Sequence, residues 1–270
     1  MMIAHIAGRG LSRASIEGSL TPVDGRRIAE AVLKERYPQA DLAFVAGSIM
    51  RGQGTPLSDI DLVVLHAALP SGAWRESFLH EGVPVEAFVH DAGTLRWFFR
   101  SDRASGHPQI IDMVVQGEVV GPRLQAAQSL RDLANRLLAL GPPALSVEEL
   151  DLLRYRLTDM ADDLAAERPT EELVSIGASL YHALAELMLR TRGVWGAGGK
   201  WVPRNLAKAD PDAAAEFDAA FDALFRRGNP EPVLLTLAKE LAPHGGFLFD
   251  GYRRPAKPEW RIDADEAVLS

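Results

Sequence analysis

The sequence predicts an α+β protein, with a mixed sheet and flanking helices in residues 1–140 and a helical bundle in residues 141–270. Three short β-prone apolar runs lie before residue 90, at 42–46, 60–65 and 83–89. After Gly141-Pro142-Pro143, apolar residues recur at spacings of three and four, which is typical of helices. A length of 270 residues with 47% hydrophobic residues is enough to build two cores.

The first half should begin with a helix that has Thr21 as its N-cap and Pro22 as its first residue, and that ends at Pro38. The other elements expected in this half are the strands at 42–46, 60–65 and 83–89, a helix from about Thr94, a helix and a short closing strand between Pro108 and Pro122, and a linking helix at 123–139.

The second half should contain four or five packed helices. The first begins after Ser146, which forms a capping box with Glu149. The apolar seam of that helix is Leu150, Leu153, Leu157, Met160 and Leu164. Further helices are expected from Thr170, Asp210-Pro211 and Asn229-Pro230, and residues 255–270 are expected to form a loosely attached tail.

Whole-chain properties limit the classes of partner. A net charge of −8 argues against binding along a nucleic-acid backbone and is compatible with a cationic acceptor. Without cysteine, the chain has neither disulfides nor cysteine-bound zinc. No leader-like segment opens the sequence and no run of eighteen apolar residues occurs, so we expect a cytoplasmic protein with no membrane partner. The oligomeric state is left open, with a homodimer as one alternative.

The main functional signal is Gly47-Ser48, followed ten residues later by Asp59-Ile60-Asp61 at the head of an apolar run. Side chains alternate along a strand, so Asp59 and Asp61 should share one side, about 6.6 Å apart. Two carboxylates at that distance repel by about 2.5 kcal/mol at an effective dielectric constant of about 20. A divalent cation, Mg²⁺ above all, would relieve this repulsion.

The Gly47-Ser48 turn can hold the phosphates of a nucleotide. Glycine permits close backbone approach, and free N–H groups together with the Ser48 hydroxyl can bind phosphate oxygens. The sequence therefore predicts a nucleoside triphosphate as the ligand. Arg51 lies in the same loop, where pairing with a phosphate and simple solvation are equally compatible with its position.

Glu86 is the one charge inside the apolar run at 83–89, and it completes a set of three acids if that strand lies beside the aspartates. A structural alternative exists for each acid. Asp59 could cap a turn, and Asp61 and Glu86 could be charges that protect an edge strand from aggregation. That alternative leaves unexplained why two acids share one face of an otherwise hydrophobic strand.

The segment from Gly47 to Leu62 resembles the Gly-Ser and Asp-x-Asp signature of the DNA-polymerase-β-like nucleotidyltransferase superfamily, and Glu86 resembles its third carboxylate. The two-part layout is similar to that of aminoglycoside nucleotidyltransferases. The resemblance implies that Asp59 and Asp61 bind Mg²⁺, and that Gly47 and Ser48 bind the β- and γ-phosphates. It also implies that Glu86 is a metal ligand or the general base.

In the family that the chain resembles, the helical domain lends a lysine to the nucleotide phosphates. Lys200, in the glycine-rich segment 193–201 between the second and third expected helices, is the candidate for this contact. A mobile loop with a solvated Lys200 is the structural alternative. Four acids away from the leucine seams could line an acceptor cleft, or could simply form the wet face of the bundle: Asp159, Asp162, Asp163 and Glu186.

The resemblance implies an enzyme that transfers a nucleoside monophosphate from a triphosphate, ATP in the first instance, to a hydroxyl of a small acceptor such as an aminoglycoside-like antibiotic. One alternative is a non-catalytic nucleotide-binding regulator or antitoxin-like module, and another is nucleotidylation of a protein. Some antitoxin-like nucleotidyltransferase domains are paired with helical ribonuclease domains, which carry an arginine followed four to six residues later by a histidine. No such pair of residues occurs after residue 141. Acceptor choice depends on cleft shape, which the sequence does not reveal.

Overall fold

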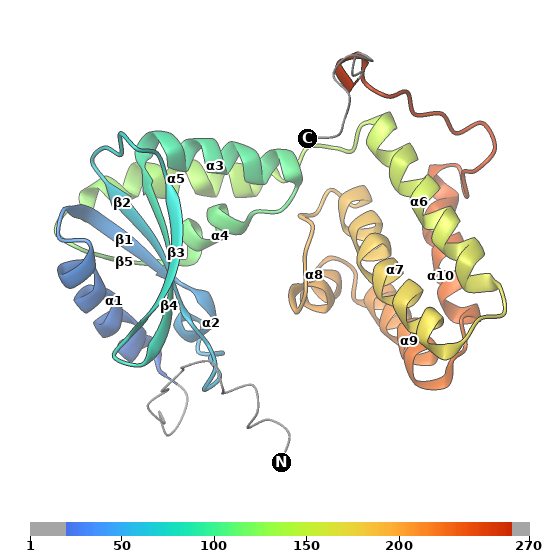
Figure 1. The fold of residues 1–270 in the computed structure, drawn as a ribbon, viewed down its shortest axis with the longest axis horizontal. Helices are drawn as coiled ribbons and strands as arrows, with labels where there is room; N and C mark the ends of the chain where they lie inside the picture. Colours follow the sequence, from blue (N-terminus) through green and yellow to red (C-terminus); the bar gives the residue numbers. More distant parts are fainter. Residues whose placement is uncertain (1–19, 261–270) are drawn as a thin grey trace, which may run out of the picture. The chain divides into compact units, whose positions relative to one another are not determined.

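A computed structural model describes residues 20–260 and divides the chain into two compact units, with the boundary between Pro143 and Ala144 (Figure 1). The predicted α+β class is confirmed, because the first unit is built on a five-stranded sheet and the second on helices. Of the predicted tail at 255–270, the part after residue 260 lies outside the described residues. No described helix combines the length and the apolar character that crossing a bilayer requires.

The first unit contains a mixed sheet with the strand order β3-β4-β2-β1-β5. Strands β2 and β4 are parallel, and the other neighbouring strands are antiparallel. Its elements, in chain order, are α1 (Pro22–Arg36), β1 (Ala40–Ala46), α2 (Gly47–Met50), β2 (Ile60–His66), β3 (Trp74–His80), β4 (Val83–Asp91), α3 (Ala92–Ser105), α4 (Gln109–Gln116), β5 (Glu118–Val120) and α5 (Gln125–Leu140).

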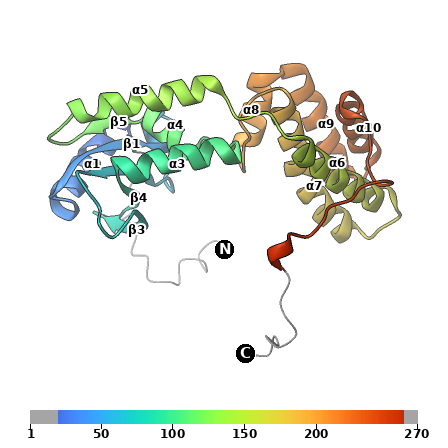
Figure 2. The same cartoon turned by 90° about the horizontal axis from the view of Figure 1, so that it is seen from above.

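Helices cover both faces of this sheet (Figures 1 and 2). On one face α1 buries Ile28 and Val32 in a cluster with strand residues such as Leu62. On the other face α4 and α5 contact β1, and α3 contacts β4. Residues on both faces of the central strands are therefore buried, and the sequences of these strands are nearly continuous apolar runs. The few polar residues within them are exceptions to this pattern.

Local sequence signals explain most element boundaries of this unit. Thr21 caps α1 as predicted, and its side chain forms a capping box with Asp24. The helix expected from Thr94 begins earlier, at Ala92, because Asp91 is the N-cap and Thr94 is its capping-box partner.

Strand β3 was not predicted from the sequence. This edge strand pairs only with β4 among the described strands, and the two join through a two-residue turn at Glu81 and Gly82. Both turn residues have positive φ, at 49° and 79°, as in the tight turns that close twisted hairpins. Four of the seven residues of β3 are exposed, so the strand lacks the apolar run that identified its neighbours.

The second unit contains five α-helices and two short 3₁₀ helices among the described residues. They are α6 (Val147–Ala165), α7 (Thr170–Thr191), α8 (Trp201–Ala209), α9 (Pro211–Arg227), α10 (Glu231–Leu241), η2 (Ala242–His244) and η3 (Pro258–Trp260). The predicted capping box of Ser146 and Glu149 is present at the start of α6. Helix α8 corrects the expectation of a loop that runs to Trp201, since Trp201 is the first residue of a helix.

Candidate active site

Three carboxylates meet at one end of the parallel pair of strands β2 and β4. Asp61 lies directly opposite Glu86 in the register of the two strands, and Asp59 precedes β2. Each of the three side chains offers one oxygen atom, and these oxygens lie within 4.8 Å of one another. The structure thus brings together the three acids that the sequence had singled out, on the side of the sheet opposite to Ile60 and Leu62.

Gly47 lies against this cluster because β1 ends opposite the aspartates. Ala46, the last residue of β1, pairs with Asp61, and the chain turns directly after it at Gly47, where φ is +92°. A Cβ atom at Gly47 would lie 2.3 Å from Oδ2 of Asp61, well inside van der Waals contact. Only glycine meets both requirements, so the backbone of the Gly-Ser turn approaches the carboxylate closely.

Ser48 is almost fully buried, at 9% exposure, and connects the two ends of the loop. Its hydroxyl donates to Oγ of Ser58 at 3.0 Å, and the same Oγ accepts the backbone N–H of Thr55 at 2.8 Å. Ser58 therefore holds the loop between α2 and β2 closed. Arg51 follows α2 as its C-cap, and the phosphate contacts expected of Ser48 and Arg51 stay predictions.

Arg75 is the residue of this site that the sequence analysis missed. Its Nε donates to Oε1 of Glu86 at 2.8 Å, and a second guanidinium nitrogen bonds to the same oxygen. The hydroxyl of Ser77 also donates to Oε1, at 3.3 Å, and the guanidinium lies over the ring of Phe88 at 4.9 Å. Arg75 thus neutralises part of the negative charge of the cluster through one oxygen of one carboxylate.

One signal for Arg75 was available in the sequence, because Glu81-Gly82 directly precedes the apolar run at 83–89, and a two-residue turn with glycine is typical of a hairpin. In the antiparallel register Ser77 lies opposite Glu86, and Arg75 lies on the same face two residues away. A hairpin prediction would therefore have placed an arginine beside Glu86.

The donor set suits a hard divalent cation. All three ligand atoms are carboxylate oxygens, the type that Mg²⁺ prefers, and two oxygens on one octahedral Mg²⁺ lie at most about 4.2 Å apart. The carboxylate oxygens of the cluster lie within 4.8 Å of one another, and side-chain shifts of under about 1 Å would bring them to the distances between oxygens that bind one Mg²⁺. The glycine at position 47 keeps the backbone, rather than a methyl group, beside Asp61.

Lys200 belongs to the second unit, where it is exposed and stands at the N-cap position of α8. Its contact with a nucleotide stays a prediction. Two of the four acids of that unit have basic partners, since Asp163 pairs with Arg168 and Glu186 pairs with Arg190 at 3.2 Å. Asp163 thus belongs to a pair near the surface, whereas Glu186 pairs with an arginine that is almost fully buried.

Comparison with known proteins places this site in a family context. Residues 26–120, from within α1 to the end of β5, match the sequence profile of the nucleotidyltransferase domain. A search of curated protein sequences finds no match. Among solved structures, the chain is similar to a nucleotidyltransferase-like protein from Exiguobacterium sibiricum, with 13% identity, a TM-score of 0.43, and coverage of 81% of this chain and 74% of that one.

The matched segment includes Gly47, Ser48 and all three clustered carboxylates. Residues 26–120 of this chain are therefore a nucleotidyltransferase domain, and the carboxylate cluster lies within it.

Proposed function

We propose that the protein transfers a nucleoside monophosphate from a nucleoside triphosphate, ATP in the first instance, to a hydroxyl group of a small acceptor. The acceptor oxygen forms a bond to the α-phosphorus, the bond between that phosphorus and the bridging oxygen breaks, and pyrophosphate leaves. The observation that carries this proposal is the convergence of Asp59, Asp61 and Glu86 beside Gly47 within a nucleotidyltransferase domain.

In this proposal Asp59 and Asp61 hold Mg²⁺, with Glu86 as a third ligand or as the general base. Bound Mg²⁺ would neutralise the charge of the triphosphate and stabilise the leaving pyrophosphate. The close approach of the Gly47 backbone gives the β- and γ-phosphates access to main-chain N–H groups, and the Ser48 hydroxyl would exchange its bond to Ser58 for one to a phosphate oxygen.

Glu86 would receive the proton of the acceptor hydroxyl if it acts as the base. Replacing Glu86 with glutamine separates the two roles. If Glu86 is the base, Glu86→Gln should lose the acidic limb of the pH–rate profile while Mg²⁺ still binds. If Glu86 is chiefly a ligand, the same variant should require more Mg²⁺ and keep the shape of the profile.

The second unit would bind the acceptor, and Lys200 would contact the nucleotide phosphates. The acidic chain is compatible with a basic, hydroxyl-rich acceptor such as an aminoglycoside. A nucleotide affinity that is unchanged in Lys200→Ala would exclude the phosphate contact. We place the protein in the cytoplasm, where nucleoside triphosphates and Mg²⁺ are abundant.

The direct test is to incubate the protein with each nucleoside triphosphate, Mg²⁺ and a panel of aminoglycosides and lincosamides, and to search by mass spectrometry for an added nucleoside monophosphate. The double variant Asp59→Asn/Asp61→Asn is the matched control and should give no product. Triphosphate binding without transfer to any acceptor would indicate a regulatory or antitoxin-like module. Nucleotidylated peptides from added protein would indicate a protein acceptor.

A further inference from the structure

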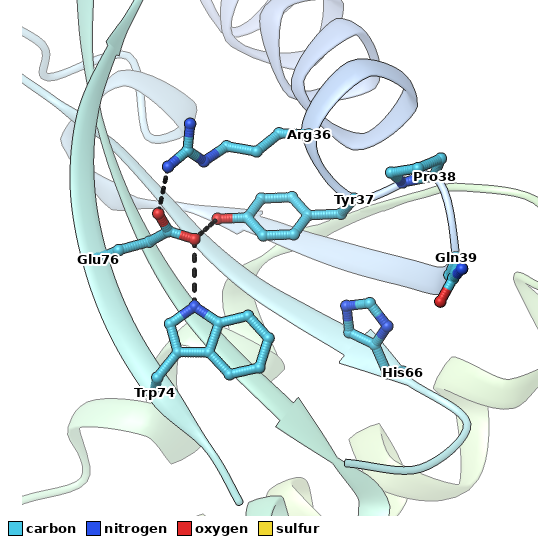
Figure 3. A pocket seen from close by; sticks show the side chains of 7 residues that line it. All are labelled: Arg36, Tyr37, Pro38, Gln39, His66, Trp74 and Glu76. Carbon is cyan, nitrogen blue, oxygen red and sulfur yellow. Dashed lines mark hydrogen bonds and ion pairs between the residues drawn. The ribbon is translucent and has the colours of Figure 1, made fainter. Parts of the chain in front are cut away.

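A second recess lies at the opposite end of β2 from the carboxylate cluster. It has a volume of about 430 Å³, and its walls include the rings of Tyr37, His66 and Trp74 (Figure 3). His66 is the last residue of β2 and Asp61 is five positions earlier, which corresponds to about 17 Å along a strand. The recess is therefore separate from the candidate active site.

The charged groups of the recess satisfy one another. Oε1 of Glu76 accepts hydrogen bonds from the Tyr37 hydroxyl at 2.8 Å and from the Trp74 indole nitrogen at 3.1 Å, and Arg36 pairs with the other oxygen. The bond from Arg36, with those from Trp74 and Tyr37, lowers the pKa of Glu76 to about 2. The positive and negative charges cancel, so the lining favours neither an anion nor a cation.

His66 is the group in the recess that still needs a partner. Its Nε2 atom is buried and has no hydrogen-bond partner. Leaving such an atom unsatisfied destabilises the folded protein. In Figure 3 the edge of the imidazole ring points between the rings of Tyr37 and Trp74, so a molecule seated there could supply the missing hydrogen bond once a shift of a neighbouring ring uncovers Nε2.

Pro38 and Gln39 also line the recess, and its three rings are open to a stacking partner. The ring centroids of His66 and Trp74 are 6.3 Å apart, and those of Tyr37 and His66 are 6.4 Å apart. Trp74 is 42% exposed, which leaves much of a large apolar ring in water. The volume lies within the range of about 300–1,000 Å³ that is typical of small-molecule sites.

We propose that this recess binds a neutral, flat aromatic or heteroaromatic molecule, which stacks on Trp74 and hydrogen-bonds to Nε2 of His66. Stacking of a planar ring on an aromatic side chain contributes to affinity whatever the identity of the ring. A hydrogen bond to a buried nitrogen adds to the affinity and fixes the orientation of the ring. This site does not depend on nucleotidyl transfer, because it shares no residue with the carboxylate cluster.

Three neutral two-ring molecules of similar shape test the proposal: indole donates a hydrogen bond, quinoline accepts one, and indene does neither. Binding is followed by the indole N–H signal of Trp74 in nitrogen–proton correlation spectra of the full chain, identified with Trp74→Phe. The matched control is Trp97, which is 60% exposed on α3. We expect indole or quinoline to shift the Trp74 signal at millimolar concentration and to leave the Trp97 signal in place.

His66→Phe keeps an aromatic ring and removes the nitrogen, so it should weaken binding of the responsive probe by about tenfold and leave indene binding unchanged. If His66→Phe does not fold, the variant Trp74→Leu, on the exposed edge strand, replaces it. Because this variant lacks the Trp74 signal, binding is measured on the probe by saturation-transfer NMR, and we expect it to be abolished. The proposal is overturned if no probe shifts the Trp74 signal. It is also overturned if His66→Phe binds the responsive probe as tightly as the unaltered protein, or if benzamidine or benzoate binds more tightly than the neutral probes.

Discussion

Two glutamates of the β3–β4 hairpin, Glu76 and Glu86, differ in what surrounds them. Each is bonded by an arginine, Arg36 for Glu76 and Arg75 for Glu86. The other neighbours of Glu76 are donors, the Tyr37 hydroxyl and the Trp74 indole. The other neighbours of Glu86 include Asp59 and Asp61.

This difference indicates which carboxylates require an external cation to balance their charge. Glu76 has enough donors of its own, and its role is structural. At the other site, the carboxylate oxygens lie within 4.8 Å of one another, and two unit charges at that distance repel by about 3.5 kcal/mol at an effective dielectric constant of about 20. The four side chains Asp59, Asp61, Glu86 and Arg75 together carry two negative charges, which a divalent cation would balance.

The largest effect should come from removing one ligand of the acidic cluster. Asp59→Asn should lower the rate of nucleotidyl transfer by on the order of 10³-fold, or about 4 kcal/mol, because the cation would lose a charged ligand. Because Asp59 is exposed and its replacement removes one of the mutually repelling charges, the unfolding temperature of the metal-free protein should not fall. A variant with full activity would contradict the assignment.

A methyl group at position 47 should be the next most damaging change. Gly47→Ala places a Cβ atom 2.3 Å from Oδ2 of Asp61 at a φ of +92°, so we expect a loss of about 2–4 kcal/mol of unfolding free energy together with loss of activity. Gly52→Ala is the matched control in the same loop. Its φ is +68° but nothing lies within 4 Å of its Cβ, so the loss should be about 1 kcal/mol, measured by urea denaturation. Equal losses in both variants would argue against the close approach to Asp61.

Glu76→Gln should affect stability and leave the acidic cluster intact. The charge-assisted bonds of Glu76 should be worth about 1–2 kcal/mol of unfolding free energy at neutral pH. The pKa of Glu76 falls from 4.5 to about 2 on folding, so this stabilisation is present above pH 4.5 and is lost as the pH falls toward 2.

The difference in stability between Glu76→Gln and the unaltered protein should therefore shrink over that acidic range. Glu30→Gln breaks an exposed helical pair with Arg26 and serves as the control, with an expected change under about 0.5 kcal/mol. A difference for Glu76→Gln that stays constant down to pH 2 would show that the carboxylate is not held in its ionised form.

The smallest effect should follow from removing the positive charge of Arg75, which is bonded to Glu86. Arg75→Gln should tighten Mg²⁺ binding by about three- to tenfold, measured by calorimetry, since Glu86 would regain its full charge. Arg27→Gln removes the same charge from an exposed pair with Glu81, so it controls for net charge and should leave the affinity nearly unchanged. Weaker binding in Arg75→Gln would show instead that the arginine orients Glu86 toward the cation.

The sequence predicted the parts of the fold whose side-chain pattern has one interpretation. Strands β1, β2 and β4 are buried on both faces, so their apolar runs were unambiguous. The starts of α1 and α6 were equally clear, because Thr21 and Ser146 lie at capping positions. The convergence of the three acids followed from strand alternation and from the parallel pairing of β2 with β4.

The missed parts depend on contacts between segments that are distant in the sequence. Strand β3 is an exposed edge, and its pattern did not separate it from a loop. Because β3 was missed, so were Arg75 beside Glu86 and the recess at Trp74. Helix α8 was missed because four glycines precede Trp201 and Pro203 follows it, and these residues usually indicate a loop.

Calorimetric titration with Mg²⁺, which needs no knowledge of the acceptor, tests the central claim most directly. The comparison is between the unaltered protein and the variants Asp59→Asn, Asp61→Asn and Glu76→Gln. We predict that each aspartate variant binds Mg²⁺ at least about tenfold more weakly, while Glu76→Gln binds it as the unaltered protein does. Equal affinity in all four proteins, or a loss confined to Glu76→Gln, would contradict the assignment of the acidic cluster as the metal site.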